Sequence, residues 1–248
     1  MNQMYIYDAA FQTMAATGSA HAARRIVAAL GTILPVRSVI DIGCARGTWL
    51  REWQAQCADE ILGLDGDFVD RSKLEIDPSC FVVHDLAARF DQARRFDLAQ
   101  SLEVAEHLAP ERAASFVADL VALAPVVLFS AAPPGQGGEN HLNEQPGEYW
   151  RRLFQTHDYV AIDCLRPLLT RENGIPAWYR YNIVLYVHRD SLDRISPFAR
   201  QFQLSAHQTI GDPSPLPYKI RKRIIRSLPR SICDRLAQMN ARRVSAGL

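Results

Sequence analysis

Short apolar runs recur along the first two thirds of the chain, and each has a polar residue at or beside its end. The runs span residues 61–65, 81–86, 96–102 and 126–130, and helix-length segments separate them. Strands that alternate with helices predict a parallel sheet with helices on both faces, and such sheets bind ligands at the carboxyl ends of their strands. Acidic residues lie at or beside two of these ends, so the sequence predicts a binding site there.

The stretch 38–50 precedes these runs and has the pattern of a buried strand, a glycine turn and a helix. Gly43 and Gly47 can adopt backbone conformations that other residues avoid, and the helix that follows directs its free amides at a ligand. From Asp41 onward the motif is D-x-G-x-A-x-G, which differs from the G-x-G-x-x-G fingerprint of dinucleotide-binding proteins. The turn predicts a nucleotide-like cofactor.

The motifs at 41–47, 65, 84–86 and 101–108 resemble, in order and spacing, those of the class I S-adenosylmethionine-dependent methyltransferases. The resemblance covers roughly residues 36–190 and implies a doubly wound, mostly parallel seven-stranded α/β sheet, the Rossmann-like methyltransferase fold. It implies that Asp65 binds the ribose hydroxyls of the cofactor, and that Asp85 and Leu86 meet the adenine. Ala45 departs from the family, in which a glycine is usual. The expected cofactor-binding residues are Asp41, Gly43, Ala45, Gly47, Asp65, Asp85, Leu86 and Ser101.

The chain is predicted to have an N-terminal helical cover at 1–35, the cofactor-binding domain at 36–190 and a C-terminal extension with basic amphipathic helices at 191–248. Within the cover, apolar residues at helical spacing predict one or two helices, with a helix start at Gly18 and Ser19. In related enzymes such a segment covers the cofactor pocket, and a packing helix without ligand contact is the alternative. Further expected elements are helices at 111–123 and 148–154 and strands at 159–163 and 182–187.

The pattern E-x-x-E-H follows the fourth apolar run. Helical spacing would place Glu103, Glu106 and His107 on one face, where two carboxylates and an imidazole form a metal-ligand set. His141, in a polar loop after the run at 126–130, is either the fourth ligand or the general base. Magnesium or manganese suits such ligands, with zinc as a further candidate. The predicted catalytic residues are His141, His107 and Glu106, and the predicted metal ligands are Glu103, Glu106, His107 and His141.

This pattern resembles the magnesium-binding set of the small-RNA 3′-terminal ribose 2′-O-methyltransferases and, more loosely, the O-methyltransferases of ubiquinone biosynthesis. A structural role is the alternative, because many class I methyltransferases carry a similar pair in which the histidine packs near the cofactor and the acid caps a turn.

The stretch 129–182 resembles a group of bacterial methyltransferases that occur with polysaccharide and other glycan biosynthesis, through the motifs N-H-x-N-E-Q and W-Y-R-x-N. The resemblance implies a sugar acceptor. Trp150 and Trp178 are candidates to stack on a pyranose face, unless both fill the edge of the core. Candidates to bind hydroxyls or phosphates are Arg180, Asn140 and Asn143.

These patterns together predict an S-adenosylmethionine-dependent O-methyltransferase that acts on a hydroxyl of a saccharide or similar polyol. A hydroxyl is a poor nucleophile at neutral pH, so His141 or His107 is expected to take its proton, with or without a metal. An RNA ribose methyltransferase is the first alternative, supported by the E-x-x-E-H set and a basic C-terminus. A non-catalytic cofactor-binding protein of the same fold is the second, for which Ala45 is the hint.

Composition narrows the location of the protein. The 248 residues are 48% hydrophobic and 22% charged, which is typical of a globular protein, and no apolar run is long enough to span a bilayer. The N-terminus lacks the pattern of a secretion signal. Five scattered cysteines without C-x-x-C spacing disfavour a disulfide framework or a structural zinc site, so we expect a cytoplasmic protein.

The stretch from Lys219 to the C-terminus has a different character. It carries nine basic residues and one acid, a balance of +8 in a chain of net charge +1. An apolar stripe that includes Ile220 and Ile224 makes this segment amphipathic. Such a helix suits an anionic membrane surface at the inner membrane face, where a lipid-linked glycan acceptor would lie, or nucleic acid phosphates. Packing on its own domain or on a partner subunit is the third interpretation, and the absence of an aromatic RNA-binding motif disfavours nucleic acid.

Overall fold

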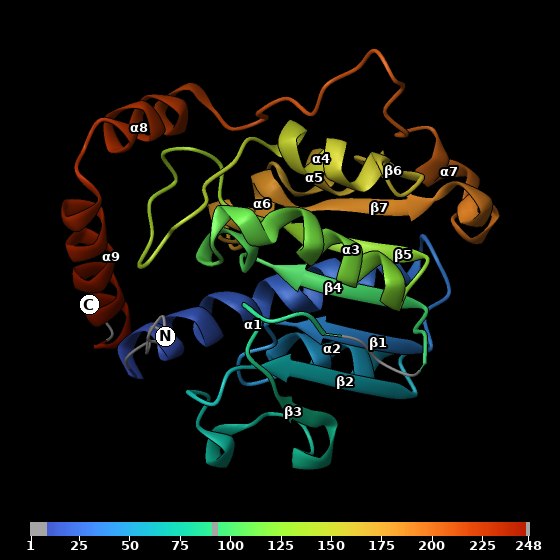
Figure 1. Cartoon of the computed structure of the whole chain (residues 1–248), viewed down its shortest axis with the longest axis horizontal. Helices are drawn as coiled ribbons and strands as arrows, with labels where there is room; N and C mark the ends of the chain where they lie inside the picture. The colour runs from blue at the N-terminus through green and yellow to red at the C-terminus, as the bar shows by residue number, and fades with distance from the viewer. Residues whose placement is uncertain (1–8, 91–93, 247–248) are drawn as a thin grey trace.

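The computed structural model describes residues 9–90 and 94–246, and within them a seven-stranded sheet in the order β3-β2-β1-β4-β5-β7-β6 (Figure 1). Strands β1 to β5 run parallel, and β7 pairs antiparallel with both β5 and β6. This arrangement confirms the predicted doubly wound fold. The strands are β1 (Ser38–Ile42), β2 (Glu60–Asp65), β3 (Phe81–Val83), β4 (Leu98–Leu102), β5 (Val126–Ser130), β6 (Tyr159–Ile162) and β7 (Val184–His188).

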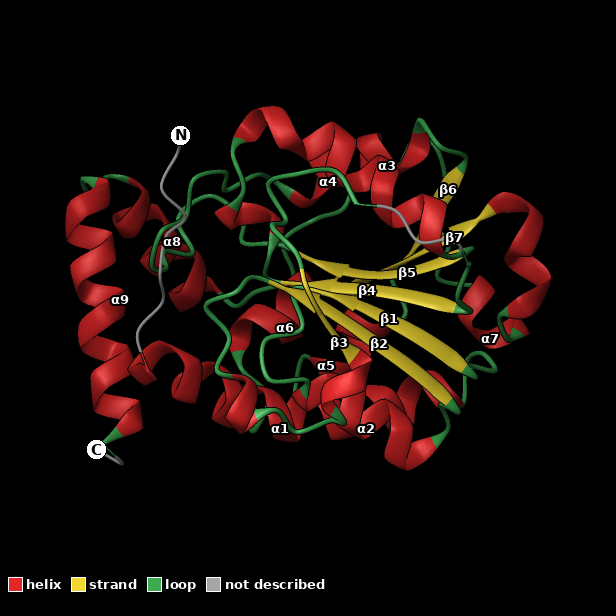
Figure 2. Ribbon diagram, turned by 60° about the horizontal axis from the view of Figure 1, so that its bottom comes forward, coloured by secondary structure: helices red, strands yellow, loops and turns green. Residues whose placement is uncertain are grey.

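Helices cover both faces of the sheet, with α1, α2 and α5 on one face and α3 and α4 on the other (Figure 2). Alternate residues of each central strand face opposite layers: Val39 and Leu98 belong to one apolar cluster, and their neighbours Ile40 and Ala99 belong to the other. The helices are α1 (Ala9–Gly31), α2 (Thr48–Gln56), α3 (Ala113–Leu123), α4 (Gly147–Gln155), α5 (Leu165–Leu169), α6 (Ala177–Asn182), α7 (Pro197–Arg200), α8 (Leu216–Arg226) and α9 (Arg230–Ser245).

The predicted helix start at Gly18 and Ser19 is wrong, because α1 runs through both residues without a break. A tertiary contact explains these small residues better than a cap does. The position where a Cβ of Gly18 would lie is 3.4 Å from the side chains of Pro176 and Trp178, and Ser19 Oγ lies 2.9 Å from the hydroxyl of Tyr179. The helix therefore uses small residues where it crosses the segment before β7. The first eight residues of the predicted cover lie outside the described residues.

Two predicted strands differ from the structure at their ends. The strand expected at 81–86 is limited to the edge strand β3, and the strand expected at 182–187 begins only at Val184. Asn182 instead ends α6, so its side chain lies at the entry to β7, beside the carboxyl end of β5. The predicted division of the chain at residues 35 and 190 stays a prediction.

The C-terminal helices lie at the edge of the sheet where the parallel strands end (Figure 1). Helix α9 contacts α1, so the first and last helices of the described residues meet on this side of the molecule. Between residues 9 and 246, excluding 91–93, no helix combines the length and hydropathy needed to cross a membrane.

Candidate active site

The glycine turn between β1 and α2 has the backbone geometry that its sequence predicts. Gly43 and Gly47 have φ angles of 85° and 83°, in the left-handed region that favours glycine. A Cβ on Gly43 would overlap the side chain of Val104, and one on Gly47 would lie 2.8 Å from Ile76. The turn is therefore fixed both by its dihedral angles and by close contacts with two neighbouring loops.

Ala45 is also left-handed, with φ 48°, so the residue that departs from the family pattern keeps a conformation that suits glycine. Its amide donates a 2.7 Å hydrogen bond to Oδ2 of Asp65, at the end of β2. The amide of Gly66 donates to the other oxygen of the same carboxylate, also at 2.7 Å. The turn after β1 thus holds the acid after β2 in a fixed orientation.

Asp41 and Asp65 lie buried on adjacent strands, and both carboxyls resist ionisation. Burial raises the pKa of Asp65 to about 6, against the opposing effect of the two amide donors. Burial also raises the pKa of Asp41 to about 8, with a further increase from the charge of Asp65. At neutral pH, Asp65 is therefore the better acceptor for hydroxyl donors.

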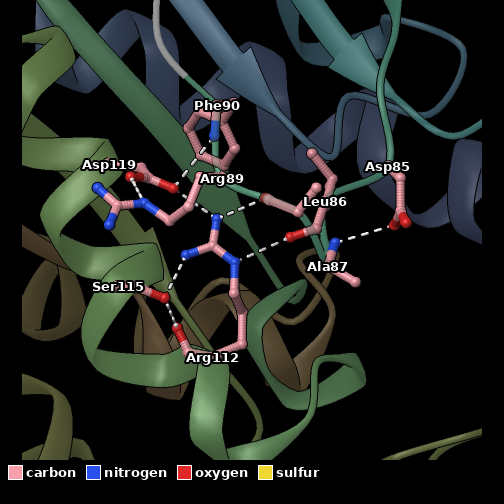
Figure 3. Close-up of polar contacts among 9 residues, drawn as sticks. Asp85, Leu86, Ala87, Arg89, Phe90, Arg112, Ser115 and Asp119 are labelled. Carbon is pink, nitrogen blue, oxygen red and sulfur yellow. Dashed lines mark hydrogen bonds and ion pairs between the residues drawn. The ribbon is translucent and has the colours of Figure 1, made fainter.

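The segment after β3, where the resemblance places the adenine, is held by a buried arginine (Figure 3). Arg112 donates to the backbone oxygens of Leu86 and Ala88, at 3.3 and 2.9 Å, and pairs with Asp119 of α3. Asp85 is exposed, and its Oδ1 accepts a hydrogen bond from the amide of Ala87. Leu86 is buried. The sequence motifs do not indicate Arg112. It nevertheless holds the backbone at Leu86, next to Asp85, where the adenine is expected.

Glu103 follows β4 in a left-handed conformation, with φ 57°. The predicted helical face of Glu103, Glu106 and His107 is therefore wrong, because the backbone reverses at Glu103 before a short 3₁₀ turn at Ala105–His107 begins. The Glu103 carboxylate instead accepts hydrogen bonds from Gln136 at 2.6 Å and Asn182 at 3.1 Å. Burial raises the pKa of Glu103, which these amide donors oppose.

The other three predicted metal ligands do come together. One ligand atom from each of Glu106, His107 and His141 lies within 4.8 Å of the others. Glu106 is buried, and neither of its carboxylate oxygens has a hydrogen-bond partner of good geometry among the described residues. Burial lowers the pKa of His107 to about 3, so its imidazole is neutral and keeps a lone pair at neutral pH. Burial and the charge of Glu103 raise the pKa of Glu106 well above its usual value. A carboxyl group beside two imidazoles is a donor set that fits a divalent metal, whose charge would favour the ionised form of the carboxyl.

A glycine-containing loop after β5 carries His141 and fixes its position. Glu144 accepts a 2.8 Å hydrogen bond from Nδ1 of His141 and two more from the amides of Gly135 and Gly137. Gly138 leaves the space that the imidazole fills, because a Cβ there would overlap the ring. Burial opposes ionisation of Glu144, but these donors outweigh it and hold the pKa of Glu144 below its usual value. His141 is thus paired with an ionised carboxylate.

The C-terminal extension contacts the same loop. Asp234 of α9 accepts a hydrogen bond from the amide of Asn140, and Arg230 donates to the side-chain oxygen of Asn140. Arg221 of α8 donates to the backbone oxygen of Gln136. Helices α8 and α9 therefore hold the segment that carries His141, which is an intramolecular role for the basic C-terminus.

Gln136, Glu144 and Asn182 were not among the predicted site residues, although the motifs N-H-x-N-E-Q and W-Y-R-x-N contain Glu144 and Asn182. Glu144 lies only three residues after His141, so the sequence contains a local signal for the contact between them. The link from Asn182 to Glu103 was not visible, because 79 residues separate the two side chains along the chain. Ser101 is fully buried in β4, and its hydroxyl has no hydrogen-bond partner among the described residues.

The residues around the glycine turn fit a nucleoside cofactor. Asp65 keeps a free lone pair on each oxygen beside its amide donors, and the left-handed turn brings backbone close to it. Three acids that the resemblance assigns to the cofactor, Asp41, Asp65 and Asp85, lie on neighbouring strands or directly after them. The fold and this site together define a class of enzymes that bind a nucleoside cofactor at the carboxyl edge of a Rossmann-like sheet.

The methyltransferase domain family model matches residues 14–161, which is more than half of the chain. The chain therefore belongs to this family. Family membership and the motif set together assign S-adenosylmethionine as the cofactor. A search of curated proteins returns no match.

Solved structures share the fold at low sequence identity. An O-methyltransferase family protein from Burkholderia thailandensis is 13% identical, with a TM-score of 0.50 over 68% of this chain and 56% of that chain. A chain of the Haloferax volcanii complex between the Trm112 methyltransferase activator and a methyltransferase is 16% identical, with a TM-score of 0.50 over 74% and 99%. CalS10 from Micromonospora echinaspora, an amino pentose methyltransferase, is 13% identical, with a TM-score of 0.49 over 75% and 100%.

Proposed function

We propose that this methyltransferase acts on a hydroxyl group of a sugar or a similar polyol. The observation that carries the proposal is the group of buried Glu106 and half-buried His107 and His141 at the edge where β4 and β5 end. A methyltransferase for an amine needs mainly to orient its acceptor, whereas one for a hydroxyl needs a group that removes the proton. The paired imidazole and carboxylate of His141 and Glu144 supply such a group.

His141 is the proposed general base. Glu144 orients the ring through Nδ1 and stabilises the positive charge that the imidazole gains when it accepts a proton. His107 is the poorer base, because the burial that lowers its pKa to about 3 disfavours the charged ring. When bound, S-adenosylmethionine supplies an electrophilic methyl group, and the chain has to place the acceptor oxygen in line with it.

A divalent metal is a second way to activate the hydroxyl at the same place. Glu106, His107 and His141 would hold the ion, which would polarise the acceptor oxygen. The proposal includes a cytoplasmic location, which suits five cysteines that are all free.

The test replaces His141 with alanine. We expect the affinity for S-adenosylhomocysteine, measured by calorimetry, to stay nearly unchanged, because the expected cofactor residues lie on or directly after β1 to β4 and not in the loop that carries His141. Methyl transfer to a panel of sugars and sugar phosphates should fall by about 10²- to 10⁴-fold, the usual contribution of a general base. His157→Ala, at the end of α4, is the matched control and should keep full activity.

A fully active His141→Ala variant would remove His141 from the mechanism. Transfer to amines but to no hydroxyl in the panel would overturn the proposed acceptor class. Dialysis against a chelator distinguishes the metal-assisted mechanism from the one that uses His141 alone. Only in the metal-assisted mechanism should turnover be lost on dialysis and restored by Mg²⁺ or Mn²⁺.

An RNA ribose hydroxyl is the second candidate acceptor, supported by the same histidine and carboxylate group and by the charge of the C-terminus. A gel-shift titration with short RNA at increasing salt tests it, because phosphate contacts weaken steeply with salt. A chain that binds S-adenosylhomocysteine but transfers no methyl group to any acceptor would instead be a non-catalytic member of the family.

A further inference from the structure

A cavity of about 520 Å³ lies between the carboxyl end of β5, the start of β7 and helix α8. Its volume is in the range of small-molecule binding sites. One side is aromatic, formed by Phe129, Trp150, Tyr181 and Tyr186. Trp150 packs 5.2 Å from Phe129, centroid to centroid, and both are buried. The four aromatic residues are only 1–7% exposed, so they give the cavity an apolar wall against which a sugar ring would pack, and not a free stacking face.

The opposite side of the cavity is cationic. Five basic side chains and one acid, Asp212, line it. Two of the five already have acidic partners, because Lys222 pairs with Asp212 and Arg166 pairs with Asp163. The remaining three are Lys219, Arg223 and Arg226.

Lys219, Arg223 and Arg226 form one row along α8, at spacings of four and three residues. Within the described part of the chain, no acid forms an ion pair with any of the three. Three unpaired cations at the edge of an aromatic cavity favour an anionic ligand, and guanidinium groups match the geometry of phosphate oxygens.

One hydrogen bond links the lining of the cavity to Glu103, the residue that follows β4. Asn182 is part of this lining, and its amide donates to Glu103 at 3.1 Å and to the side-chain oxygen of Gln136 at 2.8 Å. Gln136 in turn donates to Glu103 and is held by Arg221 of α8 through its backbone oxygen. The side chain of Asn182 would thus lie between a ligand in the cavity and the carboxylate of Glu103.

We propose that this cavity binds the phosphate group of a phosphorylated sugar acceptor. The row of Lys219, Arg223 and Arg226 contacts the phosphate, and the aromatic side contacts the sugar ring. The free hydroxyls of the sugar then point past Asn182 toward the site of methyl transfer. This inference rests on the proposed function and narrows its substrate class from sugars to sugars that carry a phosphate.

The test compares two charge-matched double variants. Lys219→Gln with Arg223→Gln removes two cations from the cavity, and Arg235→Gln with Arg243→Gln removes two exposed cations from α9 outside the lining residues. Calorimetry with glucose 1-phosphate, in the presence of S-adenosylhomocysteine, should show binding to the wild type. The cavity variant should lose at least about tenfold in affinity, the order expected for one lost charge-assisted hydrogen bond, and the α9 variant should lose none.

Equal losses in both double variants would overturn the proposal, since they would show attraction by overall charge alone. Absence of binding to the wild type would also overturn it. Unchanged affinity for S-adenosylhomocysteine confirms that each variant is folded, and Arg223→Glu alone repeats the test if the double variant is unstable. Neutral glucose should bind the wild type and the cavity variant equally weakly.

The proposed function and this inference fail in different ways. Methyl transfer to neutral sugars, together with no binding of glucose 1-phosphate, would keep the proposed function and reject the phosphate site. Binding of glucose 1-phosphate without transfer to any hydroxyl would keep the phosphate site and reject the function. Vesicles that contain polyprenyl phosphate, compared with glucose 1-phosphate, show whether the phosphate belongs to a lipid-linked or a soluble acceptor.

Discussion

Asp65 shows how one side chain is prepared for a ligand. Two backbone amides fix its carboxylate, and burial raises its pKa to about 6. The fold favours the neutral form, so the contribution of this group to stability is complete below its ordinary pKa of 3.8 and is lost as pH rises through about 6. Ribose hydroxyls need the ionised form as acceptor, so cofactor binding has the opposite dependence on pH.

Calorimetry of S-adenosylhomocysteine binding between about pH 5 and about pH 8 tests this pH dependence of cofactor binding. We expect the dissociation constant to fall about tenfold per pH unit below the pKa of Asp65 and to level off above it. Asp65→Asn should bind more weakly at pH 8 and lose most of the pH dependence. Asp59→Asn, an exposed residue before β2, is the control and should match the wild type. A constant wild-type affinity across this range would contradict the assigned role of Asp65.

The sequence predicted the local backbone of the glycine turn best. Gly43, Gly47 and Asp65 lie in one short strand, turn and helix unit and at the tip of the next strand, and their spacing alone fixes their relation. Residues that act through tertiary contacts were not predictable in this way. Arg112 and Asn182 reach partners 26 and 79 residues away, and no local pattern indicates such pairs.

At the scale of elements, the loop after β5 depends on glycines for its contact with α8. Gly135 is left-handed, with φ 86°, and a Cβ there would overlap the backbone oxygen of Lys222. A Cβ on Gly137, which has φ 70°, would lie 2.9 Å from Ile225. Helix α8 therefore packs directly on the loop backbone, and the position of His141 depends on this contact.

Gly135→Ala tests this packing. We expect it to destabilise the protein by about 1 to 3 kcal/mol, because both the left-handed angle and the overlap oppose a side chain. Hydrogen exchange should increase in α8 and in the loop that carries His141, with little change in β1 and β2. Gly31→Ala, at the end of α1 with nothing within 4 Å of its Cβ position, is the control and should leave exchange in α8 unchanged. Unaltered exchange in α8 of Gly135→Ala would show that the helix does not depend on this contact.

Element boundaries show where sequence patterns stop being informative. The apolar runs predicted β1, β2, β4 and β5 closely, because these strands are buried on both faces along most of their length. The reversal at Glu103 was not predictable, since the pattern E-x-x-E-H is also compatible with a helix. The partners of the Glu103 carboxylate, Gln136 and Asn182, lie far away in the sequence. Gly18 and Ser19 have the composition of a cap but serve a crossing of α1 with a distant segment.

At the scale of the whole molecule, charge and apolar surface are separated on α8. Its basic row lines the cavity, while Leu216, Ile220 and Ile224 point away from the domain with exposed fractions of 70%, 52% and 57%. Exposed apolar residues of α9 extend this character toward the C-terminus, among cations that give the segment from Lys219 its balance of +8. Apolar rows flanked by cations match the surface of an anionic bilayer.

We therefore expect the protein to bind vesicles that contain phosphatidylglycerol and to bind neutral phosphatidylcholine vesicles much more weakly. Salt should release the protein, because the attraction of surface cations is screened within about 10 Å at 0.1 M. Replacement of Ile220 and Ile224 by serine should reduce co-sedimentation, since each loses apolar area that the bilayer would cover. The two isoleucines are already exposed, so the double variant should keep its thermal stability.

Leu168→Ser is the matched control, because Leu168 of α5 is also exposed, at 49%, and lies outside the C-terminal segment. It should bind anionic vesicles as the wild type does. A second copy of the chain is the alternative partner for this apolar row. Light scattering distinguishes a dimer contact from a membrane contact, because it measures whether the protein is a monomer or a dimer. A wild-type dimer that becomes monomeric on replacement of Ile220 and Ile224, without affinity for anionic vesicles, would show that the row joins two protomers and would reject the membrane contact.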